Sequence, residues 1–197
     1  MSKGRVYEVG FNSGGFYPIM ESPNVKSKCY NVWKDMLRRG YSKSYKDKRP
    51  TYKDVTVCEE WFDYQSFAEW FYNNHKEGYQ LDKDLIKRGN KVYCPEFCRF
   101  IPHDLNSLLV NTVGSSRNYN LPPGVCWSKD RDKYTAWCNN GEGKTVNLGS
   151  RDTAVEAFNL YKTYKENLIK EKACNYHTKG VIDDTLYESL LVYEVDP

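Results

Sequence analysis

The sequence predicts an α+β protein made of two small domains. Two amphipathic helical segments and several short strand-like segments fill the first part, and three strands followed by one helix fill the second. The chain has 197 residues, 40% of them apolar, which is enough for one good core or two modest ones. Near residue 115 the periodicity gives way to Gly, Ser, Asn and Pro. We therefore expect domains over 1–115 and 123–197, joined by a linker over 116–122.

The first domain is expected to begin irregularly and then to form two helices. Residues 1–25 hold scattered Gly and Pro and predict at most one short strand. In "YNVWKDMLRRGY" the apolar residues share one helical stripe, and Gly40 is placed to end the helix. We expect "SKSYKDKRPTYKD" to be a basic loop and "VTVCEEW" a short strand. "DYQSFAEWFYNNH" predicts a second helix, whose aromatic stripe is core.

Basic residues are concentrated between residues 26 and 53. Ten Lys or Arg occur there against Asp35 and Asp47, with five aromatic residues interleaved. Lys and Arg neutralise phosphates, and aromatic rings stack on bases, so this composition favours nucleic-acid binding. The alternative is a solvated helix face followed by a charged loop. The candidate DNA contacts in this segment are Lys34, Arg38, Arg39, Lys46, Lys48 and Arg49.

The charge is distributed unevenly along the chain, although the formal net charge is only +3. Residues 1–122 contain 19 Lys or Arg against 14 Asp or Glu, whereas the remainder contains 10 against 12. No segment approaches the roughly 20 apolar residues of a membrane-spanning helix, and the start is polar rather than signal-like. We therefore expect an intracellular protein without a membrane partner.

The cysteines are expected to be mostly buried thiols. Their number, seven, is odd, and a reducing compartment disfavours disulfides. "CPEFC" holds a single C-x3-C pair, Cys94 and Cys98, which without a second pair is weak support for zinc. The alternative is a structural zinc site that combines this pair with Cys29 or Cys58 and a histidine.

Residues 81–106, "LDKDLIKRGNKVYCPEFCRFIPHDLN", combine oxygen ligands with turn residues. The order predicts a strand ending in carboxylates, a Gly-Asn turn, a return strand, and a short helix with Pro95 at its first position. In a regular strand Asp82 and Asp84 point to opposite faces, so only one can face the helix. Magnesium prefers oxygen ligands, and an Asp with an Asn carbonyl suffices when a phosphate completes the shell. The alternative is a solvated turn beside a capped helix.

This stretch resembles the ββα-metal motif of HNH homing endonucleases, in particular the phage branch whose second metal ligand is Asn rather than His. The resemblance implies that Asp82 and Asn106 bind one divalent cation, magnesium or manganese. It also implies that Asn90 ties the turn together. The resulting activity would be metal-assisted hydrolysis of phosphodiester bonds.

The sequence departs from that motif at the catalytic base. The family has a water-activating His after the first Asp, whereas this chain has Lys83. A lysine is ordinarily protonated at pH 7 and acts as a cation rather than as a base. The catalytic candidates are therefore Asp82, Lys83 at the scissile phosphate, Asn90, and His103, with His75 as a further substitute for the base.

The second domain is predicted to be three strands followed by a helix. "GVCWSKDRDKYTAWCNNGEGKTVNLGS" contains three strand-like segments, and "NNGEG" is a strong hairpin signal because Asn-Gly suits positive φ. "RDTAVEAFNLYKTYKENLIKEKA" has an amphipathic stripe, with Asp152 or Thr153 as its cap and Glu156 at capping-box distance from Thr153. "DDTLYESLLVY" predicts a further short helix in the tail.

Residues 124–164 resemble an AP2-type DNA-binding domain, through "GVCWSKDRDKYTAWC" and "VNLGSRDTAVEAFNLY". That family places its three-stranded sheet in the major groove, where strand side chains contact base edges. The resemblance implies that Cys126, Ser128, Trp137, Asn139, Thr145 and Asn147 face the DNA, and that Lys129, Lys133 and Lys144 contact phosphates. The family usually has arginines at several of these places. The alternative is a small module for protein contacts.

The order of the two units is that of many small bacteriophage proteins identified as homing endonucleases. "VYEVGFN", "YNVWKDMLRRGYS" and "PTYKDVTVCEEWFDYQSFAEWF" are similar to their lead-in and middle. We therefore expect a phage endonuclease that acts on double-stranded DNA in the host bacterial cytoplasm, as a monomer or homodimer. One alternative is a catalytically impaired DNA-binding protein that retains the nuclease frame. Another is a module that contacts a host protein.

Overall fold

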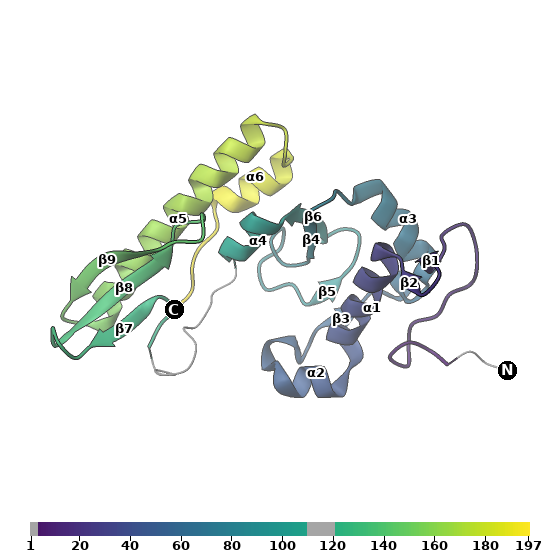
Figure 1. The fold of residues 1–197 in the computed structure, drawn as a ribbon, viewed down its shortest axis with the longest axis horizontal. Coiled ribbons are helices and arrows are strands. Elements are labelled where there is room, and N and C mark those ends of the chain that lie inside the picture. The colour runs from purple at the N-terminus through teal and green to yellow at the C-terminus, as the bar shows by residue number, and fades with distance from the viewer. Residues whose placement is uncertain (1–3, 110–120) are drawn as a thin grey trace. The chain divides into compact units, whose positions relative to one another are not determined.

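The computed structural model describes residues 4–109 and 121–197, and Figure 1 shows its fold. The chain divides into two compact units, Met1–Ile101 and Pro102–Pro197, called here the first and second units. The linker predicted over 116–122 lies mostly outside the described residues. Because the units divide between Ile101 and Pro102, the segment that follows Pro102 belongs to the second unit rather than to the first.

The first unit combines helices with three small two-stranded sheets. Strands β1 and β2 are antiparallel, β3 and β5 are parallel, and β4 pairs with β6. Its helices are α1 (Lys28–Tyr41), α2 (Lys43–Lys48) and α3 (Tyr64–Asn74), with 3-10 turns η1 (Pro50–Tyr52) and η2 (Glu59–Phe62). Its strands are β1 (Met20–Ser22), β2 (Val25–Lys26), β3 (Thr56–Val57), β4 (Tyr79–Asp82), β5 (Val92–Tyr93) and β6 (Arg99–Pro102).

The core of the first unit is aromatic. Helices α1 and α3 are where their apolar stripes predicted them, and they pack together through those stripes. Trp33 and Trp61 are both buried, and the Trp33 indole Nε1 donates to the Trp61 carbonyl oxygen at 2.8 Å. Tyr64, fully buried, meets the Trp33 ring edge to face at 5.6 Å. These large apolar side chains share one core with Val57 of β3 and Tyr93 of β5.

The predicted basic loop after α1 is wrong, because part of it is helical. Ser42 caps α2 by accepting from the Tyr45 backbone N–H at 3.4 Å. The Tyr45 ring lies under two guanidinium groups, those of Arg38 at 5.1 Å and Arg49 at 5.5 Å. This short helix has no buried residue, so it lacks the apolar stripe by which a sequence pattern shows a helix.

The predicted hairpin and short helix within 81–98 are also wrong. The return strand β5 pairs in parallel with β3, and β4 pairs instead with β6. The segment "CPEFC" forms a turn, closed by a Cys98 N–H to Cys94 carbonyl bond of 3.0 Å. The Arg99 guanidinium donates to the Pro95, Glu96 and Cys98 carbonyl oxygens, which ends the turn. The helix follows at His103.

The second unit confirms the three-stranded antiparallel sheet packed on one helix. The sheet order is β7-β8-β9, and helix α5 lies along one side of it in Figure 1. The predicted capping box is present, since Thr153 Oγ1 accepts from the Glu156 N–H and Glu156 accepts from the Thr153 N–H. The elements are α4 (His103–Leu109), β7 (Val125–Ser128), β8 (Lys133–Asn139), β9 (Thr145–Arg151), α5 (Ala154–Thr178) and α6 (Asp184–Leu191).

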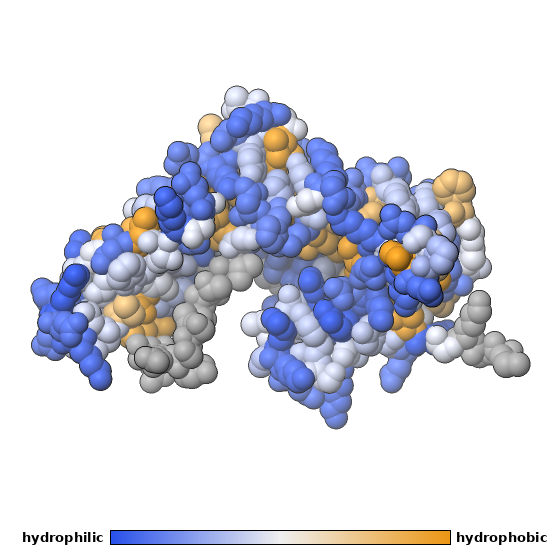
Figure 2. Space-filling model, in the orientation of Figure 1, coloured by the Kyte–Doolittle hydropathy of each residue, from blue (hydrophilic) through white to orange (hydrophobic). Residues whose placement is uncertain are grey.

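The surface drawn in Figure 2 is largely hydrophilic, with hydrophobic side chains in scattered patches. Each unit has a hydrophobic core of its own. In the second unit Ala136 and Cys138 of β8 pack on Ala157, Phe158 and Tyr161 of α5. Within the described residues, every helix is too short or too polar to cross a membrane.

Candidate functional site

The loop after β4, residues 83–91, is called here the β4 loop, and Asp82 organises its start. Asp82 is the last residue of β4, and its Oδ1 accepts from the backbone N–H groups of Asp84 at 3.0 Å and Leu85 at 2.8 Å. Burial, and secondly the neighbouring Asp84, raise the pKa of the Asp82 carboxyl. Asp82 therefore supports the turn with one oxygen, at the cost of holding a charge in a poorly solvated place.

Asn90 closes the β4 loop from the other end. Its Nδ2 donates to the Lys83 and Val92 carbonyl oxygens, each at 2.7 Å, and its Oδ1 accepts from the Val92 N–H at 3.2 Å. The side chain is buried, with 9% of the residue exposed, so these bonds replace contacts with water. Asn90 thus links both ends of the loop, which is the arrangement that the HNH resemblance implies for this residue.

Lys83 is a buried cation with a fixed partner. Only 8% of the residue is exposed, and its Nζ lies 2.8 Å from Asp84 Oδ2. The ammonium also lies 5.8 Å from the centre of the Tyr93 ring. The Tyr93 hydroxyl in turn accepts from Arg39 Nη1 at 3.2 Å, so the Tyr93 side chain contacts both the Lys83 ammonium and the Arg39 guanidinium. In this arrangement Lys83 stabilises the loop and is poorly placed to reach a phosphate.

The two expected metal ligands fall in different units. Asp82 belongs to the first unit, whereas Asn106 lies on α4 of the second unit. Within the first unit the neighbouring carboxylate, Asp84, is paired with Lys83. Neither unit alone therefore completes a metal site from the predicted residues.

The other predicted metal and base residues are dispersed. Among the described residues, no three or more His, Cys, Asp or Glu side chains are grouped so as to hold a metal ion. The cysteines of the zinc alternative, Cys29, Cys58, Cys94 and Cys98, are free thiols. His103 begins α4 and is exposed. His75 follows α3 and stacks on Phe71 at 4.4 Å.

The basic segment of the first unit divides into structural and exposed cations. Besides Arg39, Lys46 is structural, since its Nζ donates to the Lys53 and Val55 carbonyl oxygens, each at 3.0 Å. Arg38 is paired with Asp35 at 3.2 Å, and Lys34 is half-buried. Lys48 and Arg49 are exposed, as are Lys43 and Lys53. A phosphate backbone could therefore reach the second group and not Arg39 or Lys46.

The sheet of the second unit has one face against α5 and one face away from it. In β8, Tyr134, Ala136 and Cys138 pack toward α5, so the alternate residues point outward. The residues of β7 and β9 that pair with these outward-pointing residues lie on the same side of the sheet. We call this surface the outward face; it consists of Cys126, Ser128, Lys133, Thr135, Trp137, Asn139, Thr145, Asn147 and Ser150.

All six residues that the AP2 resemblance places toward DNA lie on the outward face. Trp137 is 39% exposed, and Asn139, Thr145 and Asn147 are exposed. Lys129 and Lys144 are exposed in the two hairpin turns, whereas Lys133 is paired with Asp152 at 3.1 Å. Thr135 and Ser150 were not predicted to lie on this face. Thr135 could have been found by strand alternation from Trp137. Ser150 could not, because the register shift between Ala136 and Trp137 breaks the alternation along β9.

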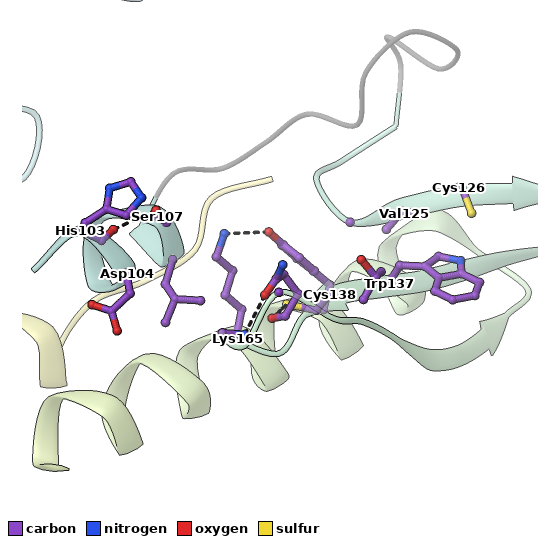
Figure 3. A pocket seen from close by; sticks show the side chains of 15 residues that line it. His103, Asp104, Ser107, Val125, Cys126, Trp137, Cys138 and Lys165 are labelled. Atoms are coloured by element: carbon purple, nitrogen blue, oxygen red, sulfur yellow. Dashed lines mark hydrogen bonds between the residues drawn. The ribbon is translucent and has the colours of Figure 1, made fainter.

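A cavity of about 670 Å³ lies beside the sheet in the second unit (Figure 3). His103, Asp104 and Ser107 line it from α4, and Trp137 and Cys138 line it from β8.

Lys165 of α5 points into this cavity. It is 4% exposed and donates from Nζ to the Tyr161 hydroxyl at 2.9 Å. Burial lowers the pKa of this ammonium. Lys165 was not predicted as a site residue, although its spacing of four residues from Tyr161 puts it on the buried stripe of the helix.

No protein-family model, no curated protein and no solved structure matches this chain.

Asp82→Asn is expected to stabilise the first unit by about 1 kcal/mol at pH 7. The asparagine keeps the Oδ1 acceptor for the Asp84 and Leu85 N–H groups and removes the buried charge. A carboxyl with a raised folded pKa stabilises the fold below its unfolded pKa, and this contribution is lost as the pH rises through the folded pKa. The difference between variant and wild type should therefore shrink as the pH falls toward about 4.

Urea unfolding at pH 7 and at pH 4 measures this difference. Asp54→Asn, which alters an exposed carboxylate of the same unit, is the control and should change stability little at either pH. A destabilised Asp82→Asn at pH 7 would show that the carboxylate charge supports the loop.

Proposed function

We propose that this chain is a bacteriophage DNA-binding protein that contacts double-stranded DNA through the outward face of its second unit. The observation that carries the proposal is a polar sheet face with an exposed tryptophan, opposite the face that α5 covers. The AP2 resemblance supports it, because the residues it assigns to DNA share this face. The major groove admits a two-stranded β-ribbon, so strands of such a face can lie in it.

Cations at the edges of the outward face support phosphate contacts. Lys129 and Arg131 are exposed between β7 and β8, and Lys144 is exposed between β8 and β9. In the first unit, Lys48 and Arg49 offer further exposed positive charge. Binding that depends on such contacts weakens as salt rises, because counterions are released from the DNA.

The proposal includes a first unit that keeps the frame of an HNH-type nuclease. Asn90 and Asp82 hold the β4 loop, while Lys83 occupies the position of the usual base and is bound to Asp84. The Lys83 nitrogen is bound to Asp84 Oδ2 at 2.8 Å, so it is engaged within the loop rather than presented as a base. We therefore place DNA binding ahead of DNA cleavage.

Trp137→Ala is expected to weaken DNA binding about tenfold, which corresponds to about 1.4 kcal/mol. The indole is the largest exposed side chain on the outward face, and its loss removes contact area at the centre of that face. Fluorescence anisotropy with a labelled duplex at low salt, followed by a salt series, measures the change.

Trp127→Ala is the matched control. Trp127 is 38% exposed, as against 39% for Trp137, but it lies on the other face and contacts Tyr134 at 4.7 Å. Its replacement should alter DNA affinity less than twofold. Equal losses in both variants would contradict the outward face as the contact surface. If wild type bound no duplex at low salt, the alternative of a module that contacts a host protein would replace the proposal.

A second candidate function is nicking of DNA by the first unit with magnesium or manganese. The observation in its favour is the Asn90 network, which fixes the loop that follows Asp82. Supercoiled plasmid incubated with either metal should be nicked by wild type and left intact by Asp82→Asn, a variant expected to remain folded. Identical results for the two proteins would exclude this activity for Asp82.

A further inference from the structure

The two asparagines of the outward face use their oxygen atoms within the protein. Asn139 Oδ1 accepts from the Gly141 N–H at 2.7 Å, and Asn147 Oδ1 accepts from the Gly149 N–H at 2.8 Å. Each bond spans two residues and fixes the amide against the backbone that follows it, in the hairpin turn for Asn139 and within β9 for Asn147. Since both residues are exposed and each oxygen already accepts one bond, the Nδ2 groups are the unused hydrogen-bonding atoms of these amides.

Other groups of the outward face follow the same pattern. The hydroxyls of Thr135 and Ser150 bond to each other at 2.9 Å, and Arg131 Nη1 donates to Ser150 Oγ at 3.4 Å. The Trp137 indole has a donor and no acceptor. The cations at the edges likewise only donate. The strands of the outward face therefore offer donors from Trp137, Asn139 and Asn147, with the hydroxyls of Ser128 and Thr145 as groups of both kinds. The hairpin turns carry exposed carboxylates, Asp130, Asp132 and Glu142, beside their cations.

The internal bonds of the two amides limit which parts of DNA the asparagines can contact. Asn recognises adenine by accepting from the N6 amino group while donating to N7. The bond from the glycine N–H uses one of the two lone pairs of Oδ1 and fixes the direction of the amide, so the paired contact with N6 and N7 would have to be made from that fixed direction. Donation through Nδ2 remains, and the acceptors found at every step of a duplex are the phosphate oxygens.

We infer that Asn139 and Asn147 donate to DNA phosphate oxygens, so that the outward face binds duplexes with little dependence on sequence. This inference rests on the proposed DNA binding and specifies the group that is contacted. Phosphate contacts position a protein on DNA without distinguishing base pairs.

Asn139→Asp and Asn147→Asp test the inference while keeping the turns. An aspartate retains the oxygen that accepts from Gly141 or Gly149, removes the amide donor, and places a negative charge toward phosphate. Asn140→Asp is the matched control for charge. Asn140 lies in the adjacent turn, where its Oδ1 accepts from the Glu142 and Lys144 N–H groups and its Nδ2 donates to Glu142.

The affinities are measured for duplexes of alternating A·T and of alternating G·C. Wild type should bind both within about threefold, and Asn139→Asp and Asn147→Asp should each lose about tenfold or more on both. Asn140→Asp should lose less than twofold. Circular dichroism melting verifies that each variant is folded.

Three results would overturn the inference. A preference of wild type above about tenfold for one duplex, or a loss by the variants on one duplex alone, would indicate contact with base edges. Wild-type affinity in Asn139→Asp and Asn147→Asp would remove the amides from the interface while leaving the proposed DNA binding intact. If wild type bound neither duplex, the proposed function would fail and the inference with it.

Discussion

Replacing Asn90 with alanine is expected to destabilise the first unit by about 3 kcal/mol. The change removes three hydrogen bonds, two from Nδ2 and one to Oδ1, at a residue that is only 9% exposed. It also leaves the Lys83 and Val92 carbonyl oxygens without this donor. An unsatisfied buried polar group costs more than the bond itself contributed. The loss should appear in urea unfolding followed by tryptophan fluorescence.

Asn74→Ala is the control for Asn90→Ala. Asn74 is exposed at the end of α3, and its side chain makes one hydrogen bond, from Nδ2 to the Trp70 carbonyl oxygen at 2.7 Å. We expect it to change stability by less than about 0.5 kcal/mol. If Asn90→Ala were no more harmful than Asn74→Ala, the β4 loop would not depend on the asparagine that bridges it.

Gly124→Ala is expected to destabilise the second unit by about 3 kcal/mol or more. Gly124 precedes β7 with φ +74, where a side chain is strained. An added Cβ would lie 2.1 Å from Cδ2 of Tyr161, within the ring of a buried core residue. Strain and overlap therefore act together, and the sheet would have to move away from α5.

Gly143→Ala separates the two causes. Gly143 has φ +84, and an added Cβ there would have no neighbour within 4 Å. We expect a loss of about 1 kcal/mol from the backbone strain alone. Thermal unfolding of both variants by circular dichroism measures the difference. Equal losses would show that the close approach of Tyr161 is not what requires a glycine at position 124.

Helices with an apolar stripe or a cap could be predicted from the sequence. Helices α1, α3, α5 and α6 all have such patterns, and the capping box of Thr153 and Glu156 forms as expected. The Asn-Gly signal and strand alternation likewise located the three strands of the second unit. These signals are local, so a single sequence contains them.

Features that depend on distant partners were not predictable in this way. The pairing of β5 with β3 rests on bonds such as Cys58 N–H to Tyr93 carbonyl, between residues far apart in sequence. The turn at Pro95 has a helix-start signal, but the Arg99 guanidinium binds its carbonyl oxygens and ends it. Helix α2 is stabilised by Tyr45 beneath Arg38 and Arg49, with no apolar stripe to show it.

The residues of the candidate sites show the same difference between local signals and contacts with distant residues. The outward face follows from alternation in one hairpin, so its six predicted residues could be found together. The burial of Lys83 could not, because a "DKD" sequence is ordinarily solvated, and its environment is built by Tyr93 and the Asn90 loop. Likewise, only the folded chain shows that Arg39 and Lys46 are used internally.

Helix α5 is longer than the sheet it covers, so its later turns need another packing partner, and the C-terminal helix α6 is one. Its 25 residues span about 37 Å at 1.5 Å per residue, whereas the seven residues of β8 span about 23 Å. The sheet is covered by the first turns, through Ala157, Phe158 and Tyr161. Beyond it the buried Ile169 and Ala173 lie on the part of α5 that α4 and α6 contact. Helix α5 thus packs on the sheet with its first turns and on α4 and α6 with its later turns, so α6 buries apolar residues that the sheet does not reach.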